Sequence, residues 1–211
     1  SLKIDIAVDL GGFTKNSRTG IFAMRAAPIQ VNYLGYSGTM AAEYMDYIIA
    51  DQTIIPENMK EHYSESIAYL PYSYMVTESL TKNSKTKFTR KDAELPDNGF
   101  VFCCFNKHYK IAPNTFFAWM RILKKVEGSI LWMPEADSAI ITNLKQQAIK
   151  YGVEGDRLIF APRLALKEDH LSRIQLADLF LDTLPYNAHT TSSDALRVGV
   201  PVLTCIGKSF T

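Results

Sequence analysis

The sequence predicts an α/β fold of two Rossmann-like units, each built on a parallel sheet. From residue 100 onward, short apolar runs alternate with amphipathic stretches of helical length, which is typical of successive βα units. Residues 1–76 repeat this rhythm less regularly. Between them, residues 77–98 are mostly polar and carry five basic side chains with little apolar patterning, so we expect a linker whose charged face is solvated.

Four strands are expected in the first unit. Two of them are apolar runs that end at glycine, one before Gly11-Gly12 and one before Gly35. Glycine after a strand lets the backbone approach a ligand or a helix closely. The expected strands are Ile4–Leu10, Ile29–Leu34, Tyr47–Ala50 and Ile67–Leu70.

Five strands and four helices are expected in the second unit. The first helix begins after Pro113-Asn114, and it ends at Lys124 and Lys125, where the helix dipole favours cations. Its apolar positions are Phe117, Met120, Ile122 and Leu123. The other expected helices are Ser138–Tyr151, which stops at Gly152, Lys167–Gln175 and Ser192–Val198. The expected strands are Phe100–Phe105, Ser129–Met133, Arg157–Phe160, Leu179–Leu181 and Pro201–Thr204.

The composition is that of an ordinary globular protein, with 47% hydrophobic and 21% charged residues among 211. The net charge of +1 gives no case for nucleic acid or an anionic membrane as partner, so any anion site must be local. Cys103 and Cys104 are adjacent and Cys205 is distant, which suits neither a disulfide framework nor a Cys-x-x-Cys metal site.

The chain has no apolar run near the roughly 20 residues that span a bilayer, and it does not start like a signal peptide. We therefore expect a soluble, cytoplasmic protein with reduced thiols. Both ends are abrupt, since a strand begins at Ile4 and the last one is followed by only a short tail. We expect a piece of a longer protein.

The segment Asn187–Asp194 reads as a loop that opens a helix. Its hydroxyls, with the free N–H groups of a helix start, favour phosphate at Thr190 and Thr191. Asp194 could accept from ribose hydroxyls. The alternative is a helix that is merely well capped, by Thr190, Thr191 or Ser192, with Asp194 as a favourable acid in its first turn.

Basic residues follow two strands of the second unit, at the edge where α/β folds bind ligands. Lys107 and Lys110 follow the first strand, and a lysine there could neutralise the charge on a diphosphate leaving group. After the third strand, His170 could stack on a base, while Lys167 and Arg173 donate to ligand oxygens. The alternatives are two exposed loop lysines and an ordinary histidine in the first turn of a helix.

Other site classes find little support. His62, His108 and His189 show no metal-ligand spacing, and no serine lies in a nucleophile-elbow pattern. A Gly-x-Gly-x-x-Gly or Walker-type loop is also absent from the sequence, which argues against dinucleotide oxidoreductases and P-loop NTPases.

Several strings, in order along nearly the whole chain, resemble the catalytic region of the protein O-GlcNAc transferase and SPINDLY family. The strings are Asp9-Leu-Gly-Gly-Phe-Thr14, Arg25-Ala-Ala-Pro-Ile-Gln30, Leu34-Gly-Tyr-Ser-Gly-Thr39, Met45-Asp-Tyr-Ile-Ile-Ala-Asp51, Phe105-Asn-Lys-His-Tyr-Lys-Ile111, Lys167-Glu-Asp-His170, Gln175-Leu-Ala-Asp178, Leu181-Asp-Thr183 and His189-Thr-Thr191. Any one string is weak, but their order and spacing together are specific. The resemblance implies inverting glycosyltransferases of the GT-B type, which have two Rossmann-like lobes.

The resemblance also implies roles for single residues. Lys110 matches the lysine that contacts the diphosphate and assists departure of the nucleotide. Lys107 stands where animal enzymes carry glutamine, and would add charge beside the diphosphate. The other matches are Ala165 and Arg173 at the uracil, Lys167 near the ribose, His170 stacked on the base, Asp194 at the ribose hydroxyls, His189, Thr190 and Thr191 at the phosphates, and Leu34 and Gly35 in the donor-sugar pocket.

The function implied by the resemblance is transfer of GlcNAc from UDP-GlcNAc to Ser or Thr of proteins, with no metal and no cofactor. The alternatives are a SPINDLY-type fucosyltransferase that uses GDP-fucose, or a nucleotide-binding relative that has lost catalysis. The long insertion between the lobes of animal enzymes is missing, which favours a bacterial-type relative.

The resemblance also divides the chain. Residues 1–76 correspond to the later part of the N-terminal lobe, 77–98 to a linker, and 99–211 to a C-terminal nucleotide-sugar lobe that is cut short. Tetratricopeptide repeats outside this chain would recruit acceptor proteins. We expect the 211 residues alone to bind nucleotide weakly and to transfer no sugar.

Overall fold

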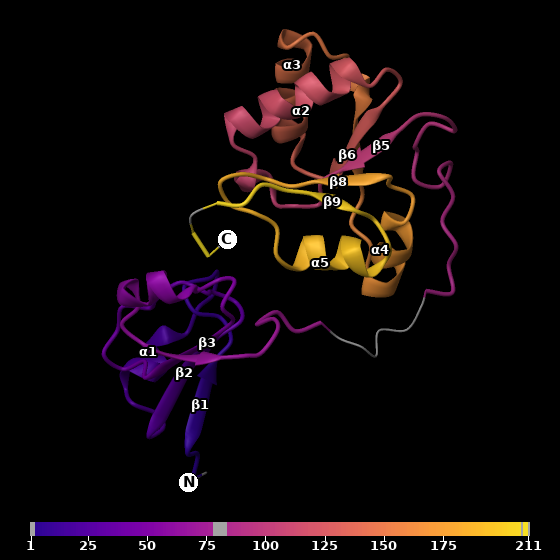
Figure 1. The fold of residues 1–211 in the computed structure, drawn as a ribbon. Coiled ribbons are helices and arrows are strands. Elements are labelled where there is room, and N and C mark those ends of the chain that lie inside the picture. The colour runs from indigo at the N-terminus through magenta and orange to yellow at the C-terminus, as the bar shows by residue number, and fades with distance from the viewer. Residues whose placement is uncertain (1–2, 78–83, 208, 211) are drawn as a thin grey trace. The chain divides into compact units, whose positions relative to one another are not determined.

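The computed structural model describes residues 3–77, 84–207 and 209–210 of the chain. They form two compact units, one containing residues up to 77 with 209 and 210, and the other containing residues 84–207 (Figure 1). Each unit is an α/β structure and is described by itself. Among the helices of the described residues, none combines the length and the apolar composition needed to cross a membrane.

The first unit has a parallel sheet of four strands in the order β1-β2-β3-β4. A small buried cluster joins Ile48 and Ala50 of the sheet with Ile55. The short helix α1 and the 3-10 turn η1 were not predicted. The elements are β1 (Ile6–Asp9), α1 (Thr19–Ala23), β2 (Ile29–Tyr33), β3 (Tyr47–Ala50), η1 (Glu57–His62) and β4 (Ser66–Tyr69).

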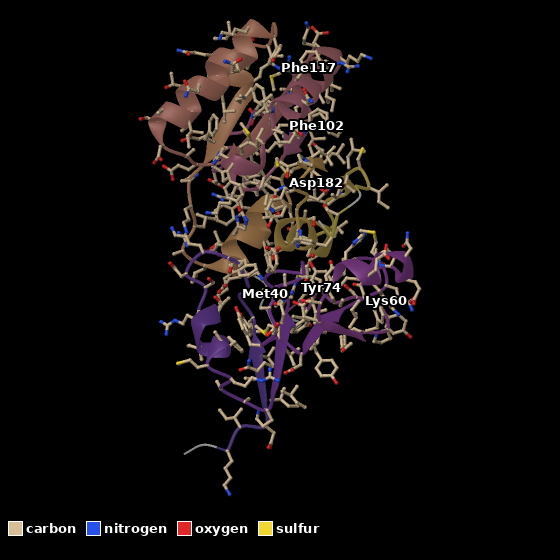
Figure 2. All side chains as sticks on the ribbon, turned by 90° about the vertical axis from the view of Figure 1, so that its left-hand side faces the viewer. Met40, Lys60, Tyr74, Phe102, Phe117 and Asp182 are labelled. Carbon is tan, nitrogen blue, oxygen red and sulfur yellow. The ribbon has the colours of Figure 1, made fainter. Side chains whose placement is uncertain are left out.

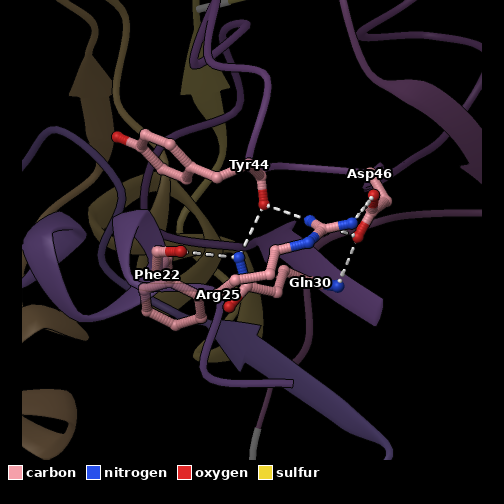
Figure 3. A network of polar contacts seen from close by, with 5 residues as sticks. All are labelled: Phe22, Arg25, Gln30, Tyr44 and Asp46. Carbon is pink, nitrogen blue, oxygen red and sulfur yellow. Dashed lines mark hydrogen bonds and ion pairs between the residues drawn. The ribbon is translucent and has the colours of Figure 1, made fainter. Parts of the chain in front are cut away.

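A polar clasp around Arg25 holds the entry to β2 (Figure 3). Arg25 lies in the left-handed region with a φ of 55°, and its guanidinium donates to both carboxylate oxygens of Asp46 and to the Tyr44 carbonyl. Gln30 donates its side-chain amide to the carbonyls of Tyr44 and Phe22 at 2.6 and 2.8 Å. The segment from Arg25 to Gln30, which belongs to the family resemblance, therefore stabilises the start of β2 within this unit.

The second unit has a parallel sheet of five strands in the order β7-β6-β5-β8-β9. Figure 1 shows α2 and α3 on one face of this sheet and α4 and α5 on the other. The direction of the crossovers thus reverses between β5 and β8. In α/β folds this topological switch point opens a crevice at the carboxyl ends of the strands.

The predicted strands and helices of both units are all present, within two residues of their expected bounds. The fold class is therefore as predicted. The second unit contains β5 (Val101–Cys103), η2 (His108–Lys110), α2 (Pro113–Lys125), β6 (Ile130–Pro134), α3 (Ser138–Lys150), η3 (Gly155–Arg157), β7 (Leu158–Ala161), α4 (Lys167–Ile174), β8 (Leu179–Leu181), α5 (Thr190–Arg197) and β9 (Val202–Leu203).

The core of the second unit centres on Trp132 and Phe180 of the sheet and Leu123 of α2, all fully buried. Figure 2 labels Phe102, which is buried here, and Phe117, which is 43% exposed. Phe117 was wrongly expected on the buried face of α2. The expected Met120 and Leu123 are buried, together with Phe116 and Trp119, so the buried face repeats at three- and four-residue steps.

The described part of the expected linker, residues 84–98, is attached to the second unit. Leu95 is buried in its core, and Arg90 donates to the Asp178 carboxylate at 3.2 Å and to the Gly99 carbonyl at 2.8 Å. Ser84 donates to the Asp169 carboxylate on α4. Arg90 is therefore not part of a solvated charged face, because the backbone that leads into β5 supplies it with acceptors.

Candidate functional site

A pocket of about 730 Å³ opens at the carboxyl edge of the second unit's sheet. Its walls are the loops that follow β5, β6 and β7, together with the start of α4. Five residues that the sequence singled out line it: Lys107, Ala165, Lys167, His170 and Arg173. Sequence reasoning missed other charged lining residues, which are Glu135, Asp137 and Arg163.

His170 and Arg173 form the most constrained part of the pocket. Arg173 is only 4% exposed, and it donates to the Pro162 carbonyl at 2.7 Å and contacts His170 Nδ1 at 3.3 Å. A guanidinium can only donate, so Nδ1 must accept and the neutral imidazole carries its proton on Nε2. The His170 ring also meets Phe105 edge to face, with centroids 5.1 Å apart.

The electrostatics of this pair favour a neutral histidine beside a buried cation. Burial lowers the pKa of His170, and the positive charge of Arg173 lowers it further. Burial also lowers the pKa of Arg173, which nevertheless stays charged at any ordinary pH. No carboxylate among the described residues forms an ion pair with Arg173. A buried cation of this kind favours a ligand that brings acceptors or negative charge.

A second cluster surrounds Lys110, beside the pocket and at the switch point between β5 and β8. The Lys110 ammonium donates to the Asn187 carbonyl at 3.0 Å and lies 3.8 Å from the centroid of the Tyr186 ring. Burial lowers the pKa of Lys110, whereas the nearby Asp182 carboxylate opposes that shift. Lys167 of the pocket wall connects α4 to α5, because its ammonium lies 3.5 Å from the Asp194 carboxylate on α5.

The start of α5 is not capped in the way that the sequence suggested. The helix begins at Thr190, with His189 at the cap position and no side-chain cap bond. Ser192 donates instead to the His189 carbonyl at 2.8 Å, and Thr191 donates to the Asn106 side chain. The alternative that a threonine or serine caps this helix is therefore wrong. Asp194 also lies beyond the first turn, where it faces Lys167 rather than the helix start.

A buried polar network fixes the loop between β8 and α5. The Asp182 carboxylate accepts from the backbone N–H groups of Thr183 and Ala188, both at 2.7 Å. Its other donors are the side chains of Asn106 at 3.3 Å, Asn187 at 2.9 Å and Thr204 at 2.7 Å. Sequence reasoning gave Asp182 no role, although a carboxylate directly after an apolar strand is a signal for the ligand edge of a sheet.

Leu34 and Gly35, expected in a donor-sugar pocket, form the turn after β2 in the first unit. Leu34 lies in the left-handed region with a φ of 71°, which is uncommon for a residue with a branched side chain. A Cβ on Gly35 would lie 2.3 Å from the Leu10 carbonyl oxygen, so only glycine fits there. This turn is thus tightly defined, and its role in sugar binding stays a prediction.

Cys103 and Cys104 are buried in the core of the second unit. Burial raises the pKa of Cys103 well above its usual value and that of Cys104 to about 12, so both thiols are unreactive. Within residues 3–77, 84–207 and 209–210, no three His, Cys, Asp or Glu side chains are grouped to hold a metal ion.

The profile of glycosyl transferase family 41 matches residues 2–87 and 77–211. A probable UDP-N-acetylglucosamine–peptide N-acetylglucosaminyltransferase of Arabidopsis thaliana, SEC, is 41% identical over 96% of this chain. The corresponding SPINDLY protein of Solanum lycopersicum is 33% identical over 98% of it. The chain spans 21% and 22% of the lengths of these two relatives.

Among solved structures, a mutant of the O-GlcNAc transferase of Thermobaculum terrenum superposes on this chain with a TM-score of 0.83. The identity is 31%, and the match covers 98% of this chain and 39% of the other. The two parallel sheets with their helices are thus of the GT-B type.

Proposed function

This chain belongs to glycosyl transferase family 41, and we propose that its second unit binds UDP-GlcNAc for transfer of GlcNAc to Ser or Thr hydroxyls of proteins. One observation carries the proposal. Lys110, half-buried, and Arg173, buried, have no carboxylate as ion-pair partner in the described part of the chain. Arg173 lines the pocket, and Lys110 follows β5 at the same carboxyl edge of the sheet. The two plant relatives are named as probable UDP-N-acetylglucosamine–peptide N-acetylglucosaminyltransferases, which supports the donor and the acceptor.

The proposed binding mode assigns each wall of the crevice one part of the nucleotide. His170 stacks on the base, and Arg173 donates to its oxygens from the pocket floor. Lys167 and Asp194 bind the ribose. The diphosphate lies against Lys110 and the start of α5. There the backbone N–H groups of Thr190 and Thr191 have no acceptor within the helix and can donate to phosphate oxygens.

The proposed reaction is a single displacement at the anomeric carbon. The acceptor hydroxyl oxygen forms the new bond on one face of the sugar, while the bond to the diphosphate oxygen breaks on the other, so the configuration inverts. The hydroxyl proton passes to a base, and UDP departs with the bonding electron pair. Lys110 and the helix dipole stabilise the charge that develops on the diphosphate, which is the task that a divalent metal performs in other enzymes.

The location and the recruitment of acceptors are part of the same proposal. Free, buried Cys103 and Cys104 fit a reducing cytoplasm, although they do not require one. Protein acceptors would be recruited by tetratricopeptide repeats of the whole protein.

Calorimetric titration with UDP, UDP-GlcNAc, GDP and GDP-fucose tests the donor. We expect UDP and UDP-GlcNAc to bind at least about tenfold more tightly than GDP. His170→Ala should weaken UDP binding about tenfold, since stacking on a base contributes roughly 1–3 kcal/mol. The matched control is His62→Ala, because His62 lies in η1 of the first unit. Preferential binding of GDP would overturn the UDP assignment and favour a SPINDLY-type donor.

A further inference from the structure

We propose that Tyr186 is a positioning residue for Lys110, whose ammonium it holds over the face of its ring at the diphosphate end of the crevice. The inference rests on the proposed function, because it assigns Lys110 to the diphosphate. It adds a residue that sequence reasoning did not single out.

The contact geometry is that of a close cation–π pair. The Lys110 nitrogen lies 3.8 Å from the ring centroid, well inside the roughly 6 Å range at which such pairs attract. The described residues offer no ion-pair partner within 4 Å of the Lys110 ammonium. Its charge is favoured by the ring, by the Asn187 carbonyl at 3.0 Å and by the more distant Asp182 carboxylate. An ammonium has three N–H groups, so this arrangement leaves N–H for a phosphate oxygen.

The Tyr186 ring is itself held in place. The Thr183 hydroxyl donates to the Tyr186 carbonyl at 2.7 Å, and Thr183 is fully buried. The ring meets His189 edge to face, with centroids 5.9 Å apart and an interplanar angle of 80°. His189 is the cap residue that directly precedes α5. The loop thus fixes the ring and the helix start together.

This arrangement addresses a specific problem of the site. Burial lowers the pKa of Lys110, and a neutral amine could not neutralise a diphosphate. A lysine side chain also has several rotatable bonds, so an unheld ammonium would sample many positions. The ring face favours the charged form and confines it on the loop that leads into α5. Tyr186 is 39% exposed, so the ring is not simply core packing.

Two variants separate the ring from the hydroxyl. Tyr186→Phe keeps the aromatic face, whereas Tyr186→Leu keeps an apolar side chain without it. The first measurement is the pKa of Lys110, from an NMR titration of its ε-methylene carbon assigned with Lys110→Arg. We expect Tyr186→Leu to lower this pKa and Tyr186→Phe to leave it unchanged.

The second measurement is kcat and KM for UDP-GlcNAc in a form of the protein that transfers sugar. We expect Tyr186→Leu to lower kcat about tenfold with little change in KM, and Tyr186→Phe to retain kcat. If Tyr186→Leu leaves both the Lys110 pKa and kcat unchanged, or if Phe and Leu lower them equally, the inference is overturned.

The two proposals fail in different ways. Absence of UDP binding by the unmodified protein would refute the proposed function. The pKa of Lys110 is measured without nucleotide, so it still decides whether the Tyr186 ring holds the ammonium.

Discussion

Lys110 and Arg173 owe their importance to what surrounds them rather than to their charge alone. Each is at least half-buried and donates to a backbone carbonyl, and no described carboxylate pairs with either. Most of the other lysines of the chain are exposed and carry no comparable constraint. Burying a cation without a partner costs free energy, and a bound anion would offset that cost. At the scale of single residues, these two cations therefore distinguish the site.

The first prediction concerns Lys110 alone. Lys110→Ala should lower the rate of sugar transfer about 100-fold or more, because a preorganised donor at a developing charge is lost. UDP binding should weaken far less, since the base and ribose contacts remain. Initial rates with UDP-GlcNAc and calorimetry with UDP, both in the full-length protein, measure the two effects, with Lys150→Ala at the exposed end of α3 as control. Unchanged transfer in the alanine variant would remove Lys110 from the mechanism.

The sequence identified charged residues that follow strands as candidates for the site. It did not identify the residues that form hydrogen bonds with the polar groups there. Lys107 and Lys110 were singled out because the carboxyl ends of parallel strands meet at one edge. Asp182 also follows a strand, yet one of its donors, Asn106, is 76 residues away in the chain. Spacing along the sequence does not show such a pairing, so the network that holds the site was missed.

The loop between β8 and α5 is the element on which the site depends most. It carries the Tyr186 ring, the Asn187 carbonyl and the start of α5, and the buried Asp182 carboxylate ties them together. Figure 2 labels Asp182. The expected helix began two residues too late, at Ser192, because Thr190 and Thr191 were counted with the loop. Their backbone is helical while the hydroxyl of Thr191 serves the network.

The second prediction concerns this loop. Asp182→Asn should lower the free energy of unfolding of the second unit by about 2–4 kcal/mol, because an amide nitrogen cannot accept and leaves buried donors unpaired. The whole chain has two tryptophans, Trp119 and Trp132, both buried in the second unit, so their fluorescence in urea follows this unit alone. Asp156→Asn, at a fully exposed side chain, is the control. Equal stability of the two variants would contradict the role given to the network.

At the scale of the whole molecule, the fold class and the existence of nearly every element followed from the apolar pattern. The strand order of the second sheet did not, because it depends on the direction in which each crossover turns. The switch point between β5 and β8, which brings Lys110 to Asn187, therefore became visible only in the structure. The sequence also misplaced Arg90. A basic residue in a polar stretch was expected in solvent, but Arg90 forms an ion pair with Asp178, directly before β8.

The third prediction is a stability maximum of the second unit near pH 7–8. Burial lowers the pKa of three histidines, His108, His170 and His189, so the unfolded state binds more protons as the pH falls through about 6.5, and stability is lost. Burial raises the pKa of Cys103 and Cys104, so above about pH 8.5 the unfolded thiols ionise and stability falls again. Urea unfolding at pH 5.5, 7.5 and 9.5 checks this. A free energy of unfolding that is equal at pH 5.5 and 7.5 would argue against it.

The most direct test of the central claim is a crystal structure of the protein with UDP. We expect nucleotide density in the second unit, with the base against His170, the ribose between Lys167 and Asp194, and the diphosphate within hydrogen-bond distance of Lys110 and the start of α5. UDP bound elsewhere, or an empty crevice in crystals soaked at a concentration that saturates binding in solution, would contradict it.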